Sequence, residues 1–349
     1  MKRGKSMRIA ILAPIWETVP PPGYGGIELV VSLLADGLVE AGQQPVLFAT
    51  GDSRSQAPLS WVSPHSLRSQ GYSTERILPQ AILHVTRVYQ QASSFDIIHN
   101  HEGGLALSLA PFVKTPTVTT LHGPIDKNNQ LFYRSFPGHP FVSLSEAQRR
   151  DCPDLNYLAT VNNGIDPDLY SIGPKKGYLL FLGRISPEKG THHAIRAAAD
   201  AGYPLVIAGK VDPFDRDYFL REISPLIDGS QVRFIGEVGG IKKSLLLQGA
   251  MAMLHPVQWP EPFGLVLAEA LASGVPVIAI GKGSIPEIIR SGKTGFVVDH
   301  PDQLADTVRW LNRIKATDCR NDCLERFHYR AMVKNYLKVY EGMLAQERK

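Results

Sequence analysis

The chain has 349 residues, of which 44% are hydrophobic and 20% charged, and its formal net charge is +4 at pH 7. This is the composition of an ordinary globular protein, and the length favours two domains. So small a charge argues against nucleic acid as a partner and suits an anionic small ligand. The three cysteines have no metal-ligand spacing, so we expect reduced thiols and a cytoplasmic protein.

The amino-terminal segment MKRGKSMR is basic, but the apolar IAILAPIW after it has no small-residue cleavage site, so we expect no signal peptide. Met7 opens a strand-like sequence and is a candidate for the original start, with residues 1–6 a leader or an added remnant. No stretch approaches the roughly 18 to 20 apolar residues of a membrane-spanning helix.

The first half alternates short apolar runs with longer amphipathic ones, which is typical of a parallel sheet covered by helices. The predicted strands are residues 7–13, 45–50, 95–100, 115–123, 141–145 and 159–165. The predicted helices are residues 27–41 and 81–93, and the polar stretch 51–80 is expected to be loop.

The second half repeats this cycle after a segment rich in Asn, Gly and Pro, residues 162–177, where we place the domain boundary. Its predicted strands are residues 178–185, 204–209, 232–238, 252–257, 275–280 and 295–298. Its predicted helices are residues 190–202, 214–226, 241–250, 264–273, 284–290 and 301–315. The last stretch, 327–344, has apolar residues at 333, 336, 337, 340 and 344, which is a helical stripe. Two such domains imply a cleft beyond the carboxyl ends of the strands.

The segment EPFGLVLAE places two carboxylates, Glu261 and Glu269, on either side of an expected helix start near Phe263 or Gly264. A helix start directs free backbone N–H groups and a positive dipole end at whatever precedes it, which suits a diphosphate. Taken alone, Glu261 could be a turn residue and Glu269 a solvated helix residue. The apolar surroundings of Glu269 favour burial, and buried carboxylates nearly always have a partner or a task.

Three other features converge on an anionic ligand. GRISPEKG offers Arg184 and Lys189 on one loop after a strand, although each could simply face solvent. GYGGIE (23–28) places glycines before a helix, where backbone can approach phosphate closely. His122 ends a strand and could point into a cleft or be structural; His99 and His101 are ambiguous in the same way.

Several sequences resemble known binding motifs but lack a residue or a context that the motif requires. SGKTG (291–295) lacks the first glycine of a P-loop, because Glu287 stands there, and GYGGIE lacks the third glycine of a dinucleotide fingerprint. The D-x-D sequences at 166–168 and 215–217 lie in turn-like contexts where Asp is common, so we expect no metal site.

Together these residues resemble the family-four retaining glycosyltransferases, which have the GT-B architecture. The order GGIE, LHG, NGID, GRISPEKG, Glu-x7-Glu, GSIPE and GKTGFVV carries the resemblance over nearly the whole chain. It implies an α/β fold of two Rossmann-like parallel-sheet domains facing a central cleft. Residues 1–165 would form the acceptor-side domain, joined by a carboxy-terminal helix at 327–344 that crosses back to it, and residues 166–326 the donor domain.

The resemblance also assigns roles to individual residues. Arg184 and Lys189 would hold the donor diphosphate, Glu261 the sugar hydroxyls and Glu269 the ribose. His122 would lie near the C6 hydroxyl of the sugar. Further donor contacts would come from Gly25, Gly26, Gly183, Glu237, Val238, Pro262, Phe263, Gly264 and Leu265. No cofactor or metal is implied.

The implied activity is transfer of a hexose from a nucleotide sugar, with UDP-glucose the first choice, to an acceptor hydroxyl in bacterial polysaccharide or glycoconjugate synthesis. The acceptor could be a glycan, a lipid-linked molecule or a small molecule. Peripheral contact with the inner face of the plasma membrane stays open. The alternatives are a GT-B phosphorylase or sugar-nucleotide epimerase, or a non-catalytic protein that binds sugar nucleotide or glycan.

Overall fold

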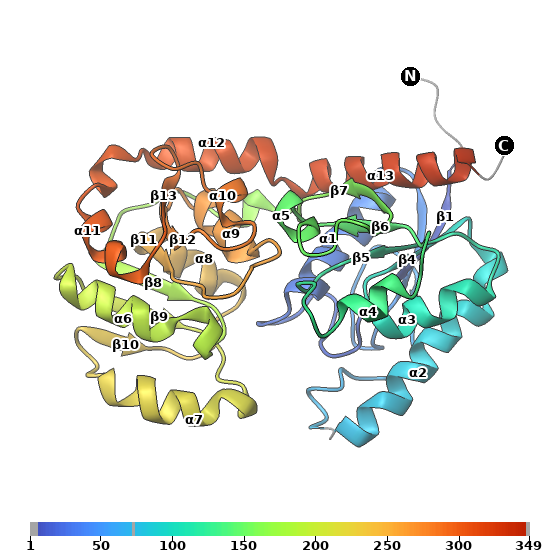
Figure 1. Ribbon diagram of the computed structural model, residues 1–349, viewed down its shortest axis with the longest axis horizontal. Coiled ribbons are helices and arrows are strands. Elements are labelled where there is room, and N and C mark those ends of the chain that lie inside the picture. Colours follow the sequence, from blue (N-terminus) through green and yellow to red (C-terminus); the bar gives the residue numbers. More distant parts are fainter. Residues whose placement is uncertain (1–5, 72–73, 347–349) are drawn as a thin grey trace. The chain divides into compact units, whose positions relative to one another are not determined.

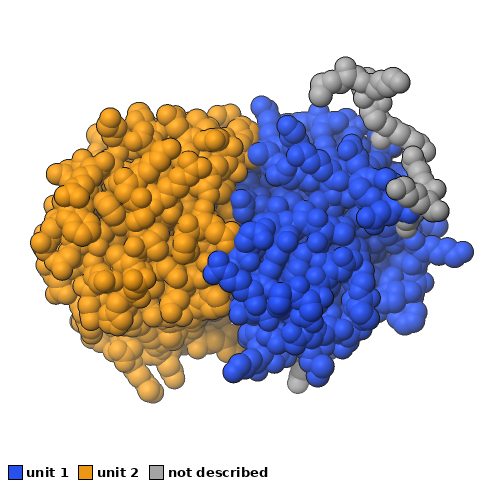
Figure 2. Space-filling model, turned by 45° about the horizontal axis from the view of Figure 1, so that its top comes forward, with its two compact units in different colours: residues 1–164, 329–349 blue, residues 165–328 orange. Residues whose placement is uncertain are grey.

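The structure is a computed structural model that describes residues 6–71 and 74–346, so most of the proposed leader, residues 1–5, lies outside the described part. The chain forms two compact units (Figure 2). Unit 1 comprises residues 1–164 and 329–349, and unit 2 comprises residues 165–328. Each unit is built on one parallel sheet (Figure 1), which confirms the predicted pair of Rossmann-like domains.

Unit 1 has a seven-stranded sheet in the order β3-β2-β1-β4-β5-β6-β7. Its strands are β1 (Arg8–Leu12), β2 (Gln44–Phe48), β3 (Leu59–Ser60), β4 (Ile97–Asn100), β5 (Thr117–Thr120), β6 (Phe141–Ser143) and β7 (Tyr157–Thr160). Its helices are α1 (Gly26–Glu40), α2 (Thr74–Gln90), α3 (Gly104–Leu109), α4 (Gln130–Arg134), α5 (Glu146–Arg149) and α13 (Tyr329–Gln346). Apolar residues of α2 and α3 pack with β1, β2 and β4 in one core cluster.

Unit 2 has a six-stranded sheet in the order β10-β9-β8-β11-β12-β13. Its strands are β8 (Tyr178–Leu182), β9 (Leu205–Ala208), β10 (Val232–Phe234), β11 (Ala250–His255), β12 (Val277–Ile280) and β13 (Gly295–Val298). Its α-helices are α6 (Thr191–Asp200), α7 (Arg216–Tyr218), α8 (Gly240–Gly249), α9 (Leu265–Ala272), α10 (Ile285–Ile288), α11 (Leu304–Val308) and α12 (Ala316–Arg326). β8 is buried along its whole length, as expected for a central parallel strand covered on both faces.

Some predicted boundaries were wrong. Helix α2 begins at Thr74, inside the stretch predicted to be loop, because the chain tolerates Pro79 within the helix. The short elements β3, α3, α4 and α5 were missed, since segments of two to six residues carry too little periodicity. The 301–315 region breaks into short helical turns, and α12 after it was not predicted.

The last helix, α13, returns to unit 1 as predicted and contacts α1. At the contact, a methyl group on Gly37 would lie 2.6 Å from a side-chain carbon of Val333, so the glycine allows the close crossing. The predicted stripe was partly wrong, because Leu337 and Leu344 are only half-buried. The buried face is instead Tyr329, Met332, Val333, Tyr336, Val339, Tyr340 and Met343.

Candidate active site

The candidate site of unit 2 lies where the loops after β8 and β11 leave the sheet. These strands are neighbours, and the following strands, β9 and β12, lie on opposite sides of the pair. Such a switch in strand order opens a crevice at the carboxyl ends of the strands, where ligands of open α/β sheets bind. GRISPEKG follows β8, and the segment that leads to Glu261 follows β11.

Two predicted residues 72 positions apart in sequence, Lys189 and Glu261, meet at this edge of the sheet. The Lys189 ammonium donates to Glu261 Oε2. The indole N–H of Trp259 donates to the same oxygen at 3.0 Å, and the ammonium lies 4.8 Å from the centre of the Trp259 ring. The carboxylate and the cation are therefore both held in place by one aromatic side chain.

Glu261 stays ionised because of these neighbours. Burial raises the pKa of its carboxyl, but the Lys189 ammonium and the hydrogen bonds from Lys189 and Trp259 outweigh burial and leave the pKa below its ordinary value. Burial lowers the pKa of His255 to about 4, so this imidazole is neutral 4.0 Å from Glu261 Oε2. At neutral pH the Glu261 carboxylate is therefore negatively charged where it meets the Lys189 ammonium.

Arg184 is also paired with carboxylates. Its guanidinium donates to Glu188 and, at 3.2 Å, to Asp215. Burial raises the pKa of Asp215 despite the nearby arginine. Asp215 belongs to one of the rejected D-x-D sequences and was interpreted as a turn residue, so its contact with Arg184 was missed. Two of the five guanidinium N–H groups are used here, which leaves donors for an anion.

Helix α9 begins close to the predicted position, so its first N–H groups have no partner within the helix. It begins at Leu265, and Gly264 before it has φ of +81°, a conformation that favours glycine. Phe263 is buried, and its backbone carbonyl accepts from the Ser284 hydroxyl at 3.0 Å. This contact ties the loop before α9 to the turn before α10.

Glu269 is buried in α9, with 1% of its surface exposed, as its apolar surroundings predicted. Its partners are Lys243 of α8 and the hydroxyl of Tyr170, which donates to Oε1 at 2.8 Å. Neither partner was predicted, because the contacts join distant parts of the sequence. The second oxygen, Oε2, is buried without a hydrogen-bond partner in the described part of the chain.

Three segments that adjoin the carboxyl ends of β8 and β11 each contain a buried polar atom without a partner among the described residues. Ser186 Oγ in the loop after β8, His255 Nε2 at the end of β11 and Glu269 Oε2 are buried without a hydrogen-bond partner among the described residues. A buried polar group without a partner costs free energy, so proteins retain few of them without a reason. Each of these atoms could accept or donate a hydrogen bond to a polar ligand.

The other predicted residues of unit 2 lie directly after strands or in loops. Gly183 directly follows β8, and Pro262 is buried beside Glu261. Glu237 and Val238 lie in the loop between β10 and α8; Glu237 is exposed and Val238 half-buried.

In unit 1, Gly25 and Gly26 lie where α1 begins, after the long loop that follows β1. Gly25 has φ of +147°, and a methyl group there would lie 2.7 Å from Pro21 and 3.1 Å from Glu28 Oε2. The glycine is therefore required by the packing of this turn. Burial raises the pKa of Glu28 from 4.5 to about 7.

Glu28→Gln should change how stability depends on pH. A pKa raised in the folded state means that the group stabilises the fold below pH 4.5 and that this contribution is lost as the pH rises through about 7. As the pH rises from 4.5 through about 7, the free energy of unfolding of the wild type should therefore fall relative to that of the variant, by a total on the order of 3 kcal/mol. Urea unfolding at a series of pH values measures this, with Glu341→Gln on the exposed surface as control. Parallel pH profiles for all three proteins would contradict it.

His122 lies just after β5 and belongs to a row of histidines. His122 Nε2 is 2.8 Å from His101 Nδ1, and His101 Nε2 is 3.2 Å from His99 Nδ1. Burial lowers the pKa of all three, so the imidazoles are neutral. His99 and His101, ambiguous in sequence, are therefore linked to the predicted His122.

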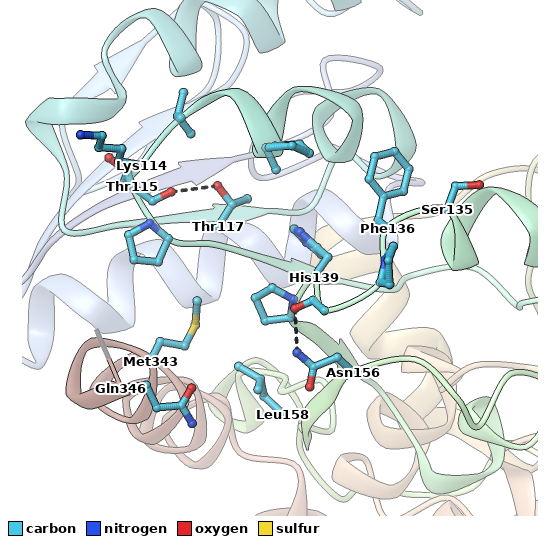
Figure 3. A pocket seen from close by; sticks show the side chains of 17 residues that line it. Lys114, Thr115, Thr117, Ser135, Phe136, His139, Asn156, Leu158, Met343 and Gln346 are labelled. Atoms are coloured by element: carbon cyan, nitrogen blue, oxygen red, sulfur yellow. Dashed lines mark hydrogen bonds between the residues drawn. The ribbon is translucent and has the colours of Figure 1, made fainter. Parts of the chain in front are cut away.

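Unit 1 also has a hollow of about 610 Å³ on the amino-end side of β5, β6 and β7. Figure 3 shows Thr117, His139, Asn156, Leu158 and Met343 along its wall. His139 is held by a 2.8 Å hydrogen bond to Thr119. None of the residues predicted from sequence to act in the site lines this hollow.

Two models of known protein families match the chain, one in each half. The family model described as Glycosyl transferases group 1 matches residues 167–326, and the one described as Glycosyltransferase Family 4 matches residues 24–169. The chain is a family-four glycosyltransferase with the GT-B fold. The match of the first model covers the whole crevice of unit 2 described above.

Relatives along the full length support this assignment. The glycosyltransferase is 25% identical over 370 residues to a phosphatidyl-myo-inositol mannosyltransferase of Mycobacterium leprae, with 96% of each chain covered. It is similar to AviGT4, a glycosyltransferase involved in avilamycin A biosynthesis, with 29% identity, a TM-score of 0.75 and coverage of 97% and 98% of the two chains. It also shares the fold of HepE from Anabaena, solved with UDP and glucose, with 20% identity, a TM-score of 0.75 and coverage of 96% and 100%.

No helix in the described part of the glycosyltransferase has the length and apolar character needed to span a bilayer.

Proposed function

We propose that this glycosyltransferase is a retaining enzyme that moves a hexose from a nucleotide sugar, with UDP-glucose the first choice, to an acceptor hydroxyl. The observation that carries the proposal is the contact of Lys189 with Glu261 directly before α9. It brings together a cation for a phosphate, a carboxylate for sugar hydroxyls and free backbone N–H groups. A nucleotide sugar needs all three.

The chemistry follows from charge. The diphosphate gains negative charge as the bond to the sugar breaks, and Lys189, Arg184 and the backbone of Phe263, Gly264 and Leu265 are suited to stabilise it. Lys189 has three N–H donors, so it can keep its bond to Glu261 while it binds phosphate.

The remaining donor contacts follow the same proposal. Glu261 Oε1 is left to accept from sugar hydroxyls, and the orphaned Glu269 Oε2 is left to accept from ribose. The backbone near Glu237 and Val238 would lie against the base, with Gly183 and Pro262 lining the donor. Gly25, Gly26 and His122 of unit 1 are assigned to the donor sugar on the family resemblance.

Retention by double displacement needs a carboxylate behind the anomeric carbon, and we assign no residue to that role. We therefore propose a front-face reaction in which the leaving phosphate accepts the proton of the acceptor hydroxyl. No metal has a role in this scheme, so activity should survive EDTA.

The acceptor is proposed from the relatives. One relative is a phosphatidyl-myo-inositol mannosyltransferase, and AviGT4 serves avilamycin A synthesis. They support a glycan, lipid-linked or small-molecule acceptor in bacterial polysaccharide or glycoconjugate synthesis. We place the enzyme in the cytoplasm with peripheral contact to the inner face of the plasma membrane; the exposed Leu78, Ile82 and Leu83 of α2 support that contact, and co-sedimentation with phospholipid vesicles tests it.

The deciding experiment measures release of nucleotide diphosphate from UDP-, GDP-, ADP- and TDP-sugars, glucosyl and mannosyl, without acceptor and in EDTA. We expect slow release from one donor, and we expect Glu261→Gln to abolish it. Glu325→Gln, an exposed carboxylate on α12, is the matched control and should keep the wild-type rate. Proton NMR of the first transfer product, once an acceptor is found, would show whether the anomeric configuration is retained.

The alternatives predict other results. Conversion of the donor to an isomerised nucleotide sugar, with no net release of nucleotide, would indicate an epimerase, and turnover that requires free phosphate would indicate a phosphorylase. No release, together with no nucleotide binding by calorimetry, would overturn the enzyme and favour a binding protein.

A further inference from the structure

The row of histidines in unit 1 ends on the carboxy-terminal helix. Tyr340 of α13 is fully buried, and its hydroxyl is 2.7 Å from His99 Nδ1. On the other side of the ring, His99 Nε2 is 2.8 Å from Thr120 Oγ1, which is itself 3.0 Å from the hydroxyl of Tyr336. A continuous path of hydrogen bonds therefore runs from His122 through two imidazoles to α13.

The direction of donation along this path is fixed at its buried end. Burial raises the pKa of Tyr340 well above 10, so its hydroxyl keeps its hydrogen. Among the described residues, His99 Nδ1 is the one hydrogen-bond partner of that hydroxyl. A buried O–H group left without an acceptor is costly, so Tyr340 donates and His99 Nδ1 accepts.

The tautomers of the other two rings follow from this acceptor. The one lone pair of His99 Nδ1 accepts from Tyr340 at 2.7 Å, and His101 Nε2 lies 3.2 Å from the same nitrogen. His101 Nε2 therefore carries the hydrogen and shares that lone pair, since a lone pair on His101 Nε2 would be repelled by it. Neutral His101 then has an unprotonated Nδ1, and His122 Nε2, at 2.8 Å from it, must be the next donor. Neutral His122 is left with a lone pair on Nδ1.

We propose that Tyr340 is a positioning residue that fixes the tautomer of His122, through His99 and His101, with Nδ1 as a hydrogen-bond acceptor. This inference rests on the proposed function, in which His122 lies near the transferred sugar. In this tautomer His122 Nδ1 can accept a hydrogen bond from a sugar hydroxyl, and it is a poor partner for a group that can only accept hydrogen bonds. The helix that closes unit 1 thus determines which hydrogen-bonding pattern the sugar must present.

The structure offers a matched control for this proposal. Tyr336 is one turn before Tyr340 on α13, is also fully buried and stacks with it at 6.2 Å between ring centres. Its hydroxyl contacts Thr120 and makes no hydrogen bond to an imidazole among the described residues. Tyr336→Phe therefore removes the same group from the same helix while His99 Nε2–H still donates to Thr120.

The test is long-range proton–nitrogen NMR of the full-length protein labelled with ¹⁵N-histidine, without donor. His122 signals are assigned by comparison with His122→Gln. We expect wild-type His122 Nδ1 to resonate as an unprotonated ring nitrogen and Nε2 as a protonated one, with the same pattern in Tyr336→Phe. In Tyr340→Phe both directions of donation become available, so the two nitrogen shifts of His122 should move toward each other.

Kinetics add a second measurement. Tyr340→Phe should lower kcat/KM roughly 3- to 10-fold, which corresponds to the free energy of one hydrogen bond. The same substitution should have no effect on kcat/KM in a His122→Ala background. A protonated His122 Nδ1 in the wild type, or the same shift changes in both tyrosine variants, would overturn the proposal. The wild-type spectrum needs neither variant to fold nor any donor to be turned over, so the proposed function can fail while the tautomer assignment stands.

Discussion

Lys189→Met is expected to lower kcat about 10²- to 10³-fold, the cost of removing one group that stabilises charge developing in a transition state. Donor affinity should fall much less, because in the proposed scheme Arg184 and the start of α9 would still bind the diphosphate. The variant should also need a higher pH. Lys189 lowers the pKa of Glu261, so its removal raises that pKa, and activity that depends on the carboxylate is lost at a higher pH on acidification.

The measurement is kcat against pH under saturating donor, with donor binding followed by calorimetry. Lys242→Met is the control. Lys242 is exposed on α8, so this variant removes the same positive charge at a position away from the Lys189–Glu261 contact. Lys189→Arg should recover part of the turnover, because the charge returns in a different shape. An unchanged kcat in Lys189→Met would refute the role given to the Lys189–Glu261 contact.

Gly209→Ala is expected to destabilise unit 2 by about 3 kcal/mol, through overpacking against rigid backbone. Gly209 follows β9, and a methyl group there would lie 1.7 Å from the carbonyl oxygen of Gly183. Backbone cannot move aside as a flexible side chain can, so the carboxyl ends of β8 and β9 must separate. That displacement also moves Arg184.

Gly183→Ala is the matched control for stability. It adds the same methyl group across the same contact, but nothing lies within 4 Å of it. The four tryptophans are Trp16 and Trp61 in unit 1 and Trp259 and Trp310 in unit 2. In a Trp16→Phe, Trp61→Phe background, fluorescence during urea unfolding reports unit 2 alone. Equal midpoints for the two alanine variants would contradict the prediction.

The sequence predicted the fold where its signal is local and repeated. Buried parallel strands such as β8 are continuous apolar runs, and the long helices carry a clear period. The short helices α3, α4 and α5 were missed because one turn shows no period. The buried face of α13 was partly wrong because Met332 and Met343 pack inward in place of Leu337 and Leu344.

The sequence motifs predicted which residues belong to the candidate site, but they did not predict which of these residues contact each other. Lys189 and Glu261 were both named from their motifs, yet the sequence does not reveal that they touch each other or that Trp259 holds both. Lys243 and Tyr170 beside Glu269 gave no signal, because the pairing depends on how α8 and the loop before β8 pack on α9. A buried carboxylate in an apolar helix signals only that partners must exist.

The path of the chain through the two units has a consequence for synthesis on the ribosome. Unit 2 is one continuous segment whose ends meet, with the Ile165 amide donating to the Phe327 carbonyl at 2.8 Å. Its residues have all been made before α13 emerges, so it can fold while unit 1 still lacks the helix that contacts α1 and His99. The half of the enzyme that is translated first is therefore the half that is completed last.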